Sequence, residues 1–325
     1  MHSFHDLSLT FKQRFDTRHF PVSPESLYDP AQYMLQLGGK HVRPVLCLMA
    51  NELVNTISDD AYHVANAIEL FHNFTLIHDD IMDKAPLRRG MMTVHEKYGD
   101  STALLAGDVM LVAAYESLNR IKSQYLQKVL SLFNVTARQV CEGQQLDMDF
   151  SKKRGNDNAV SFDQYVNMIE LKTSVLLAAS LKMGAIISGA GEGNQQNLFE
   201  FGKHLGLAFQ VQDDYLDVFG DPGKFGKQQG GDIVANKKTF LWLHVIDVAN
   251  KEQLLELESS ASKQPKEHVE LVTRIYKECN VDAWAMELKE KYYQQAMHYL
   301  EDVAITSSRK IHLADLAKHL LNRDT

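Results

Sequence analysis

Residues 161–188 read SFDQYVNMIELKTSVLLAASLKMGAIIS, and this stretch is the clearest indicator of the fold class. Ser161 is a suitable N-cap, because its hydroxyl can accept a hydrogen bond from the first turn of a helix. The second half of the stretch is apolar on nearly all sides, which is typical of a helix buried at the centre of a protein. We therefore expect a long central helix that begins just after Ser161.

Other segments carry the same helical signature. Residues 102–118 read TALLAGDVMLVAAYESL, and within residues 198–219 large apolar side chains recur at spacings of three and four. No proline lies between residues 87 and 221, and a proline inside a helix costs about 3 kcal/mol. Asn-Gly and Asp-Gly hairpin turns with alternating flanks are missing. These features together predict an all-α protein.

Loops rich in Gly, Ser, Asn and Lys separate the helical segments, and each is too short to link domains. They lie at about 150–160, 188–195, 219–236 and 259–266. The sequence thus predicts a single all-α domain over residues 1–325, with residues 1–30 as a docked N-terminal extension.

The composition narrows the class of protein. The chain has 325 residues, a net charge of −8 and a pI near 6.0, which argues against nucleic-acid binding because that requires surplus Lys and Arg. Its 3 cysteines are widely spaced, so a disulfide framework and a Cys-rich zinc site are excluded and a reducing compartment is favoured. No signal-peptide run and no window of about 18 uninterrupted apolar residues occurs. We expect a soluble, cytoplasmic protein without a membrane span.

Two acidic clusters with the same pattern are the sharpest chemical feature. Both read Asp-Asp-x-x-Asp within apolar segments, TLIHDDIMD at 75–83 and FQVQDDYLD at 209–217. Like charges one helical turn apart repel, so one cluster could be a solvated helix end but two apolar-flanked copies call for a cation. Carboxylates without nearby Cys or a second His suit Mg2+ better than zinc. The candidate metal ligands are Asp79, Asp80, Asp83, Asp213, Asp214 and Asp217.

Basic side chains accompany both clusters. Each alone is most often a solvated surface charge, but beside two Mg2+ sites they fit a polyphosphate ligand, whose oxygens metals bridge and cations neutralise. His72 lies seven residues before Asp79, on nearly the same helix face, and Gln210 shares a face with Asp213. The basic candidates are Lys40, Arg43, Arg88, Arg89, Lys172, Lys227 and Lys237.

Two further motifs do not support other chemistry. His95-Glu96-Lys97-Tyr98-Gly99 begins like a zinc-protease helix, but glycine stands where the second ligand belongs. The glycine-rich segment 189–193 lacks the GK[ST] ending of a phosphate loop, so it is interpreted as a turn between helices.

The ordered motifs resemble those of the trans-isoprenyl diphosphate synthases, or polyprenyl synthetase family. The match covers roughly residues 35–245 and carries LGGKHVRP, LIHDDIMD…LRRG, ALLAGD, Gly143-Gln144 with Asp147, MIELKTS, FQVQDD and GKQQGGDI in the family's order. Two departures are small: His41 stands where arginine is common, and Leu241 where many relatives have proline.

The resemblance implies head-to-tail prenyl transfer in an antiparallel helical bundle around a central cavity, usually in a homodimer. Three Mg2+ ions, bridged by the two aspartate motifs, would hold the allylic diphosphate, and metals and cations would stabilise the departing diphosphate. The released diphosphate would then remove the proton. By motif position, Arg88, Lys172, Lys227 and Lys237 would bind the allylic diphosphate. The isopentenyl-diphosphate pocket would contain Lys40, Arg43, His72 and Arg89, with Thr173 and Gln210 stabilising the allylic cation and Arg323 closing over the homoallylic substrate.

Product length is expected from residues before the first aspartate. In related synthases a bulky residue five positions upstream acts as a floor under the growing chain; here it is Phe74, followed by the small Thr75, with Phe71 one turn deeper. This pattern favours geranylgeranyl diphosphate, with a farnesyl diphosphate synthase as the alternative. A terpene cyclase and a squalene or phytoene synthase would carry different acidic motifs. A non-catalytic subunit of a heterodimeric synthase would usually lose aspartates, and all six are present.

Overall fold

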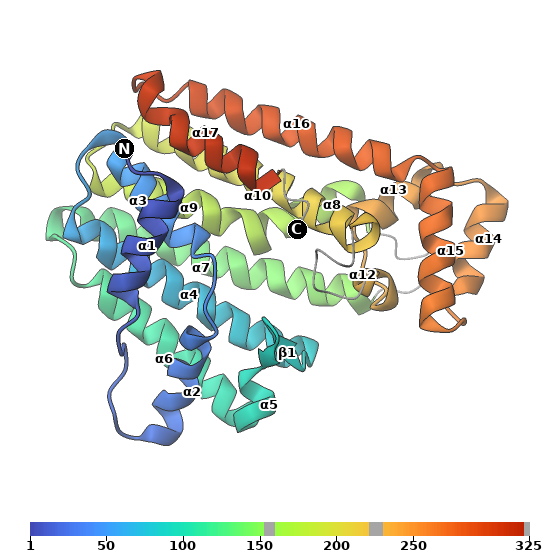
Figure 1. The fold of residues 1–325 in the computed structure, drawn as a ribbon, viewed down its shortest axis with the longest axis horizontal. Coiled ribbons are helices and arrows are strands. Elements are labelled where there is room, and N and C mark those ends of the chain that lie inside the picture. The colour runs from blue at the N-terminus through green and yellow to red at the C-terminus, as the bar shows by residue number, and fades with distance from the viewer. Residues whose placement is uncertain (153–159, 221–229, 322–325) are drawn as a thin grey trace. The chain divides into compact units, whose positions relative to one another are not determined.

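A computed structural model describes residues 1–152, 160–220 and 230–321, and it confirms the all-α prediction (Figure 1). By the proximity of its residues the chain divides into two compact units. Unit 1 comprises Met1–Val135, Ala179–Phe199 and Val303–Leu313, and unit 2 comprises Thr136–Ala178, Glu200–Asp302 and Ala314–Thr325. The first aspartate cluster therefore belongs to unit 1 and the second to unit 2.

Unit 1 is organised around the long helix α4, which packs side by side with α6 (Figure 1). Ser58 caps α4 by accepting a hydrogen bond from the Ala61 amide, and the helix ends in the aspartate cluster. Helix α1 packs on α3, so the N-terminal segment docks as expected, although α2 already begins within it. The complete helices of unit 1 are α1 (Phe4–Phe15), α2 (Glu25–Gln36), α3 (Val42–Val54), α4 (Asp59–Asp83), α5 (Val94–Tyr98) and α6 (Asp100–Leu118).

A small hairpin after α4 was not expected. Strands β1 (Leu87–Arg88) and β2 (Met91–Met92) pair antiparallel around a two-residue turn. Both turn residues have positive φ, 53° at Arg89 and 78° at Gly90, which is the geometry of tight hairpins. Because Arg-Gly is not one of the usual turn pairs and each strand has only two residues, neither composition nor alternation signals the hairpin.

Unit 2 combines whole helices with parts of helices that it shares with unit 1. Helices α7 (Ser123–Lys152), α9 (Val175–Ile187), α10 (Glu192–Phe219) and α17 (Ser307–Leu321) contribute residues to both units. The remaining elements of unit 2 are α8 (Phe162–Ile169), the π-helical turn η2 (Glu170–Ser174), α12 (Gly231–Val234), α13 (Phe240–Val248), α14 (Lys251–Ser260), α15 (Pro265–Glu278) and α16 (Val281–Glu301).

The predicted central helix begins where expected but is not uniform. Ser161 caps α8 in a capping box with Gln164. After eight residues the helix widens into the π-turn η2 before continuing as α9. The predicted break at 188–195 is too long, because α10 already begins at Glu192, whose charge is favourable at a helix start. The predicted loop at 219–236 also contains the short helix α12.

Helix α6 is long and apolar enough, by length and composition alone, to cross a membrane. One of its faces, including Ala106 and Met110, is buried, and the helix packs against α4 in the manner of a core helix. The other face exposes Leu104, Leu105 and Val112. Packing against α4 thus leaves an apolar stripe exposed on α6.

Candidate active site

The first aspartate cluster occupies the last turn of α4. Asp80 is 2% exposed, and both of its oxygens accept hydrogen bonds from Arg88, at 2.8 Å from Nε and 2.7 Å from Nη2. A bidentate guanidinium–carboxylate pair is the strongest common way to compensate a buried carboxylate. The hairpin turn thus returns Arg88 onto the cluster that precedes it.

The next residue, Arg89, contacts a different part of the chain. Its guanidinium lies against Gly39, where a Cβ atom would come within 3.0 Å of Nη2. Glycine at this position therefore lets the arginine lie directly over the backbone of the loop that precedes α3. The positive φ of Arg89 turns the chain between the two side chains, so consecutive arginines reach separate partners.

Arg43, His72 and Arg89 form a group that we call the basic pocket. Arg43 Nη1 donates to His72 Nε2 at 3.1 Å. Burial lowers the pKa of Arg43 to about 10, and the nearby Glu69 carboxylate opposes that effect. Burial and then the charges of Arg43 and Arg89 hold the pKa of His72 well below its usual range, so His72 is neutral and its Nε2 can accept the hydrogen bond from Arg43. Lys40 is exposed in the same loop.

The second aspartate cluster lies on α10 and has different neighbours. Asp214 is 2% exposed and accepts hydrogen bonds from Gln210 Nε2 at 2.8 Å, Tyr165 Oη at 3.2 Å and the Phe240 amide at 3.2 Å. Burial, then the charge of Asp232, raises the pKa of Asp214 to about 8. Tyr165 was not among the predicted site residues, because nothing in the local sequence pattern marks it as a partner of Asp214.

Asp217 and Asp232 connect this cluster to the loop that follows. The Asp232 amide donates to Asp217 Oδ2 at 3.0 Å, and Asp232 pairs with Lys237 at 3.1 Å. A small cavity beside Asp214 is lined by Asp232, Lys237, Thr239, His268 and Tyr276, among others. Asp232 was not among the predicted site residues, although it belongs to the quoted motif GKQQGGDI. Its carboxylate adds a further negative charge to those of the cluster.

The π-turn η2 carries Lys172 and Thr173. Lys172 Nζ donates to Asp147 Oδ2 at 2.6 Å. A Cβ at Gly143 would come within 2.3 Å of the Lys172 amide nitrogen, so α7 can approach the turn this closely only with glycine there. Such π-turns are frequent at functional sites. The structure therefore brings together two of the quoted motifs, the one that contains Gly143 and Asp147 and the one that contains Lys172.

The donor set fits Mg2+ without forming a preassembled cage. Within the described ranges no group of three or more His, Cys, Asp or Glu side chains converges as a metal site. Mg2+ typically uses one or two carboxylates and completes its shell with water and substrate phosphate, so this result does not oppose it. The buried Asp214, with Asp213 and Asp232 raising its pKa, is a position where a bound cation would relieve repulsion.

The predicted product-length residues pack inside unit 1. Phe71 is 1% exposed and meets Phe133 edge-on at 5.2 Å between ring centroids. Phe74 is 8% exposed and contacts the His78 ring edge-on at 4.6 Å. Thr75 Oγ1 donates to the His72 carbonyl. Two other predicted residues, Lys227 and Arg323, lie outside the described residues.

A family model for polyprenyl synthetases matches residues 24–279. The chain belongs to the polyprenyl synthetase family. This match confirms the resemblance drawn from the motifs, and it begins after helix α1.

The chain is also similar along nearly its full length to individual synthases. It is 35% identical over 307 residues to the geranylgeranyl diphosphate synthase of Methanosarcina mazei, covering 94% of this chain and 92% of that protein. It is 32% identical to the geranylfarnesyl diphosphate synthase of Natronomonas pharaonis, covering 94% and 93%. A crystal structure of a geranylgeranyl pyrophosphate synthase aligns with a TM-score of 0.93 at 40% identity, covering 100% of both chains. The chain therefore has the all-α fold of the isoprenoid synthases.

Proposed function

We propose that this polyprenyl synthetase condenses isopentenyl diphosphate head-to-tail with dimethylallyl, geranyl and farnesyl diphosphates to form all-trans geranylgeranyl diphosphate. The observation that carries the proposal is the division of cations in unit 1: Arg88 is bonded to an aspartate of the first cluster, whereas Arg89 lies over Gly39 and belongs with Arg43 and His72 to the basic pocket. Two diphosphates of different kinds need such a division, one held through metal and the other by cations alone.

The aspartate clusters would bind the allylic diphosphate. Bound Mg2+, up to three ions, would neutralise that diphosphate and make it a better leaving group. The residues that would hold the metal are Asp79, Asp80, Asp83, Asp213, Asp214 and Asp217. Arg88, Lys172, Lys227 and Lys237 would supply positive charge. Asp80 and Asp232 already hold Arg88 and Lys237 in place, so their charges are oriented before substrate arrives.

The basic pocket would bind isopentenyl diphosphate. Neutral His72 keeps Arg43 oriented through the 3.1 Å hydrogen bond, and Arg89 is fixed over Gly39. Lys40, exposed in the same loop, would add a fourth contact. Held by its diphosphate, the isopentenyl group would present its double bond in a fixed direction. Such orientation lowers the barrier to reaction, which affinity alone would not do.

The reaction then needs little side-chain acid–base chemistry. The allylic C–O bond breaks and the departing diphosphate keeps the electron pair. The oxygen dipoles of Thr173 and Gln210 would stabilise the cation that remains. The isopentenyl double bond forms the new C–C bond with that cation, which leaves a tertiary cation on the isopentenyl unit. A proton lost from the carbon next to this new cation goes to the released diphosphate, and the C–H electron pair forms the product's double bond. Gln210 must turn its amide for this role, because its nitrogen now donates to Asp214.

The proposed product length rests on Phe74 and on the relatives. The Methanosarcina mazei relative is a geranylgeranyl synthase, whereas the Natronomonas pharaonis relative makes a longer product by its name. Phe74 is buried above a second aromatic layer of Phe71 and Phe133. These buried, mutually tilted rings would stop a chain at a fixed depth. A farnesyl product remains the alternative.

We also propose a cytoplasmic homodimer. The exposed stripe on α6 comprises the apolar side chains Leu104, Leu105 and Val112, with the acidic side chains Asp108 and Glu116 exposed beside it. Exposed apolar stripes on helices are typical of protein interfaces. Sedimentation equilibrium should give twice the 36.8 kDa chain mass, and Leu105→Asp should shift the protein to monomer. A monomeric wild type would contradict the homodimer.

A two-substrate assay tests the function. Purified protein is incubated with isopentenyl diphosphate and each allylic diphosphate, with Mg2+ or with EDTA, and the products are separated by chain length. We expect Mg2+-dependent elongation that stops at twenty carbons. Cyclised hydrocarbons would indicate a terpene cyclase, head-to-head products a squalene or phytoene synthase, and no turnover a non-catalytic subunit.

A further inference from the structure

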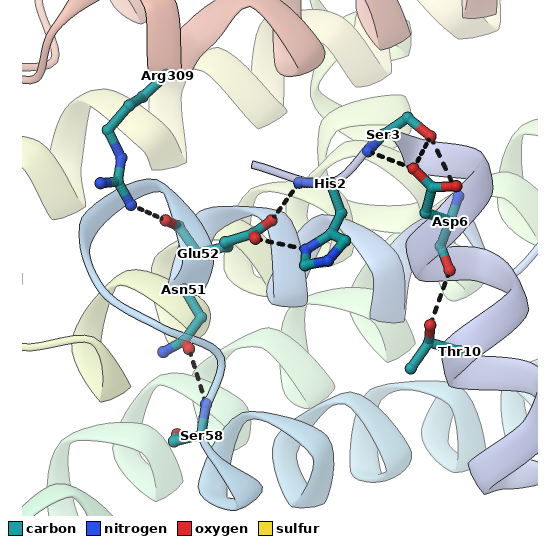
Figure 2. Close-up of polar contacts among 8 residues, drawn as sticks. All are labelled: His2, Ser3, Asp6, Thr10, Asn51, Glu52, Ser58 and Arg309. Atoms are coloured by element: carbon teal, nitrogen blue, oxygen red, sulfur yellow. Dashed lines mark hydrogen bonds and ion pairs between the residues drawn. The ribbon is translucent and has the colours of Figure 1, made fainter.

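Helix α1 lies antiparallel along α3 and is fastened to it at both ends. At its start, the His2 amide and ring Nδ1 bind the Glu52 carboxylate near the end of α3, at 2.9 and 2.6 Å (Figure 2). Ser3 and Asp6 form a capping box there, and Arg309 donates to the Glu52 carbonyl (Figure 2). The start of α1 is therefore held firmly by groups distant in sequence.

The other end of α1 covers His41, the residue just before α3. Phe11 and Phe15 are 0% and 3% exposed, and their ring centroids lie 5.4 and 6.0 Å from that of His41. His41 has a left-handed backbone, φ 49° and ψ 35°, which is unfavourable for a histidine unless its surroundings hold it. The two phenylalanines bury the ring and so help to fix that conformation.

His41 in turn fixes a buried carboxylate. Its Nδ1 donates to Glu69 Oε1 at 2.9 Å, and the His41 and Glu69 side chains are only 5% and 4% exposed. Asn73 Nδ2 donates to the same oxygen at 3.2 Å. The other oxygen, Glu69 Oε2, is buried, and no group in the described part of the chain donates a hydrogen bond to it. The position of this carboxylate therefore depends on His41 and Asn73.

Glu69 acts electrostatically on the basic pocket. Its charge favours the cationic forms of Arg43 and Arg89, against the burial that lowers their pKa values. Arg43 Nε is itself buried and, in the described ranges, makes no hydrogen bond, so this attraction contributes to its placement. A chain of contacts thus leads from α1 through His41 and Glu69 to the two arginines.

We infer that His41 and Glu69 are positioning residues for isopentenyl diphosphate, and that helix α1 is the element that holds them in place. This inference rests on the proposed function, because it assigns the basic pocket to isopentenyl diphosphate. Neither residue would touch the substrate. They would set the geometry of Arg43 and Arg89, so disturbing them should weaken isopentenyl diphosphate binding and leave the allylic substrate little affected.

The experiment compares four full-length variants. His41→Ala removes the donor to Glu69, whereas His41→Asn keeps an amide donor near the same place and tolerates the left-handed backbone. Phe15→Leu loosens the cover over His41. Phe20→Leu is the matched control, since Phe20 is a buried phenylalanine of the same N-terminal segment whose ring stacks on Tyr28.

Two readouts are used: KM for each substrate in steady state, and calorimetric titration with isopentenyl diphosphate in EDTA. For His41→Ala we expect both KM and Kd for isopentenyl diphosphate to rise about tenfold, the scale of losing one buried hydrogen bond. Phe15→Leu should raise them about threefold by a smaller displacement. His41→Asn and Phe20→Leu should stay close to the wild type, and no variant should change the allylic KM by as much.

Different failures are distinguishable. If the wild type binds and condenses isopentenyl diphosphate but His41→Ala does so equally well, the positioning inference is wrong and the proposed function stands. The inference is also overturned if both substrates weaken equally, or if His41→Asn is no better than His41→Ala. If the wild type neither binds nor condenses isopentenyl diphosphate, the proposed function fails and the inference fails with it.

Discussion

In the first aspartate cluster an arginine compensates the buried carboxylate, whereas in the second the compensation comes from neutral donors. Asp80 receives two hydrogen bonds from Arg88. Asp214, equally buried, receives them from an amide side chain, a phenol and a backbone amide, and its pKa rises to about 8. Two clusters with the same Asp-Asp-x-x-Asp pattern thus compensate their buried carboxyl groups in different ways.

This electrostatic difference predicts how each cluster would respond to a bound cation. A carboxylate already paired with arginine must share its charge between that arginine and any metal. A carboxyl group with a raised pKa holds a proton near neutral pH and releases it when a metal binds. We therefore expect the second cluster to couple metal binding to proton release and to depend more strongly on pH.

The largest expected effect is common to both clusters. Asp79→Ala and Asp213→Ala should each reduce kcat roughly a thousandfold or more, the scale of losing a group that stabilises developing charge. The fold should survive, because removing one of several like charges relieves repulsion. Turnover is measured at saturating Mg2+, with circular dichroism as the control for folding. Near wild-type turnover in either variant would remove that cluster from the metal site.

A smaller effect separates the neighbouring arginines. Arg88→Ala leaves Asp80 buried without its cation, so it should lower stability and raise the allylic KM. Arg89→Ala should mainly raise KM for isopentenyl diphosphate, by about tenfold for each lost charge-assisted hydrogen bond. Steady-state kinetics with each substrate varied in turn gives the split. Equal changes in both KM values for both variants would show that the two pockets are divided wrongly.

The clusters also differ five residues upstream, where the first has Phe74 and the second Ala208. Phe74→Ala removes the ring that packs on His78 and Phe71. We expect products longer by at least one five-carbon unit, with little change in the first condensation. Chromatography of the dephosphorylated products gives the chain lengths. An unchanged distribution would place the floor elsewhere, with Phe71 as the next candidate.

Much of this could be predicted from the chain alone, because helices and metal carboxylates leave periodic patterns. The all-α fold, the cap at Ser161 and the family all follow from local sequence. The hairpin at 87–92 could not be predicted, since its strands are too short to alternate and Arg-Gly is an uncommon turn. The π-turn at 170–174 also left no signal, because it depends on the close approach of α7 at Gly143.

Within the site, motif positions predicted the residues but not their partners. Arg88 was expected to bind diphosphate, and the structure pairs it with Asp80. Tyr165 bonds to Asp214 across 49 positions of sequence, and Glu69 bonds to His41 across 28. Contacts at such separations are set by how the helices pack, and no local pattern records them. The site residues themselves stay predictions until the variants are measured.

The pH dependence of stability tests the contrast between the clusters most directly. Asp214 has a pKa raised to about 8 in the folded protein, from 3.8 for an unperturbed carboxyl. Between these values the folded state holds a proton that the unfolded state has released, so this group makes stability fall as pH rises toward 8.

Urea unfolding in EDTA, from pH 5 to pH 8, should therefore show a decline in the wild type that Asp214→Asn largely removes. Asparagine keeps an acceptor for Tyr165 and can donate to a turned Gln210 amide, so the variant should be at least as stable as the wild type at pH 8. Asp80→Asn, which weakens a cation-compensated pair, should be less stable than the wild type at pH 8 and keep the decline. The same decline in Asp214→Asn as in the wild type would contradict the account.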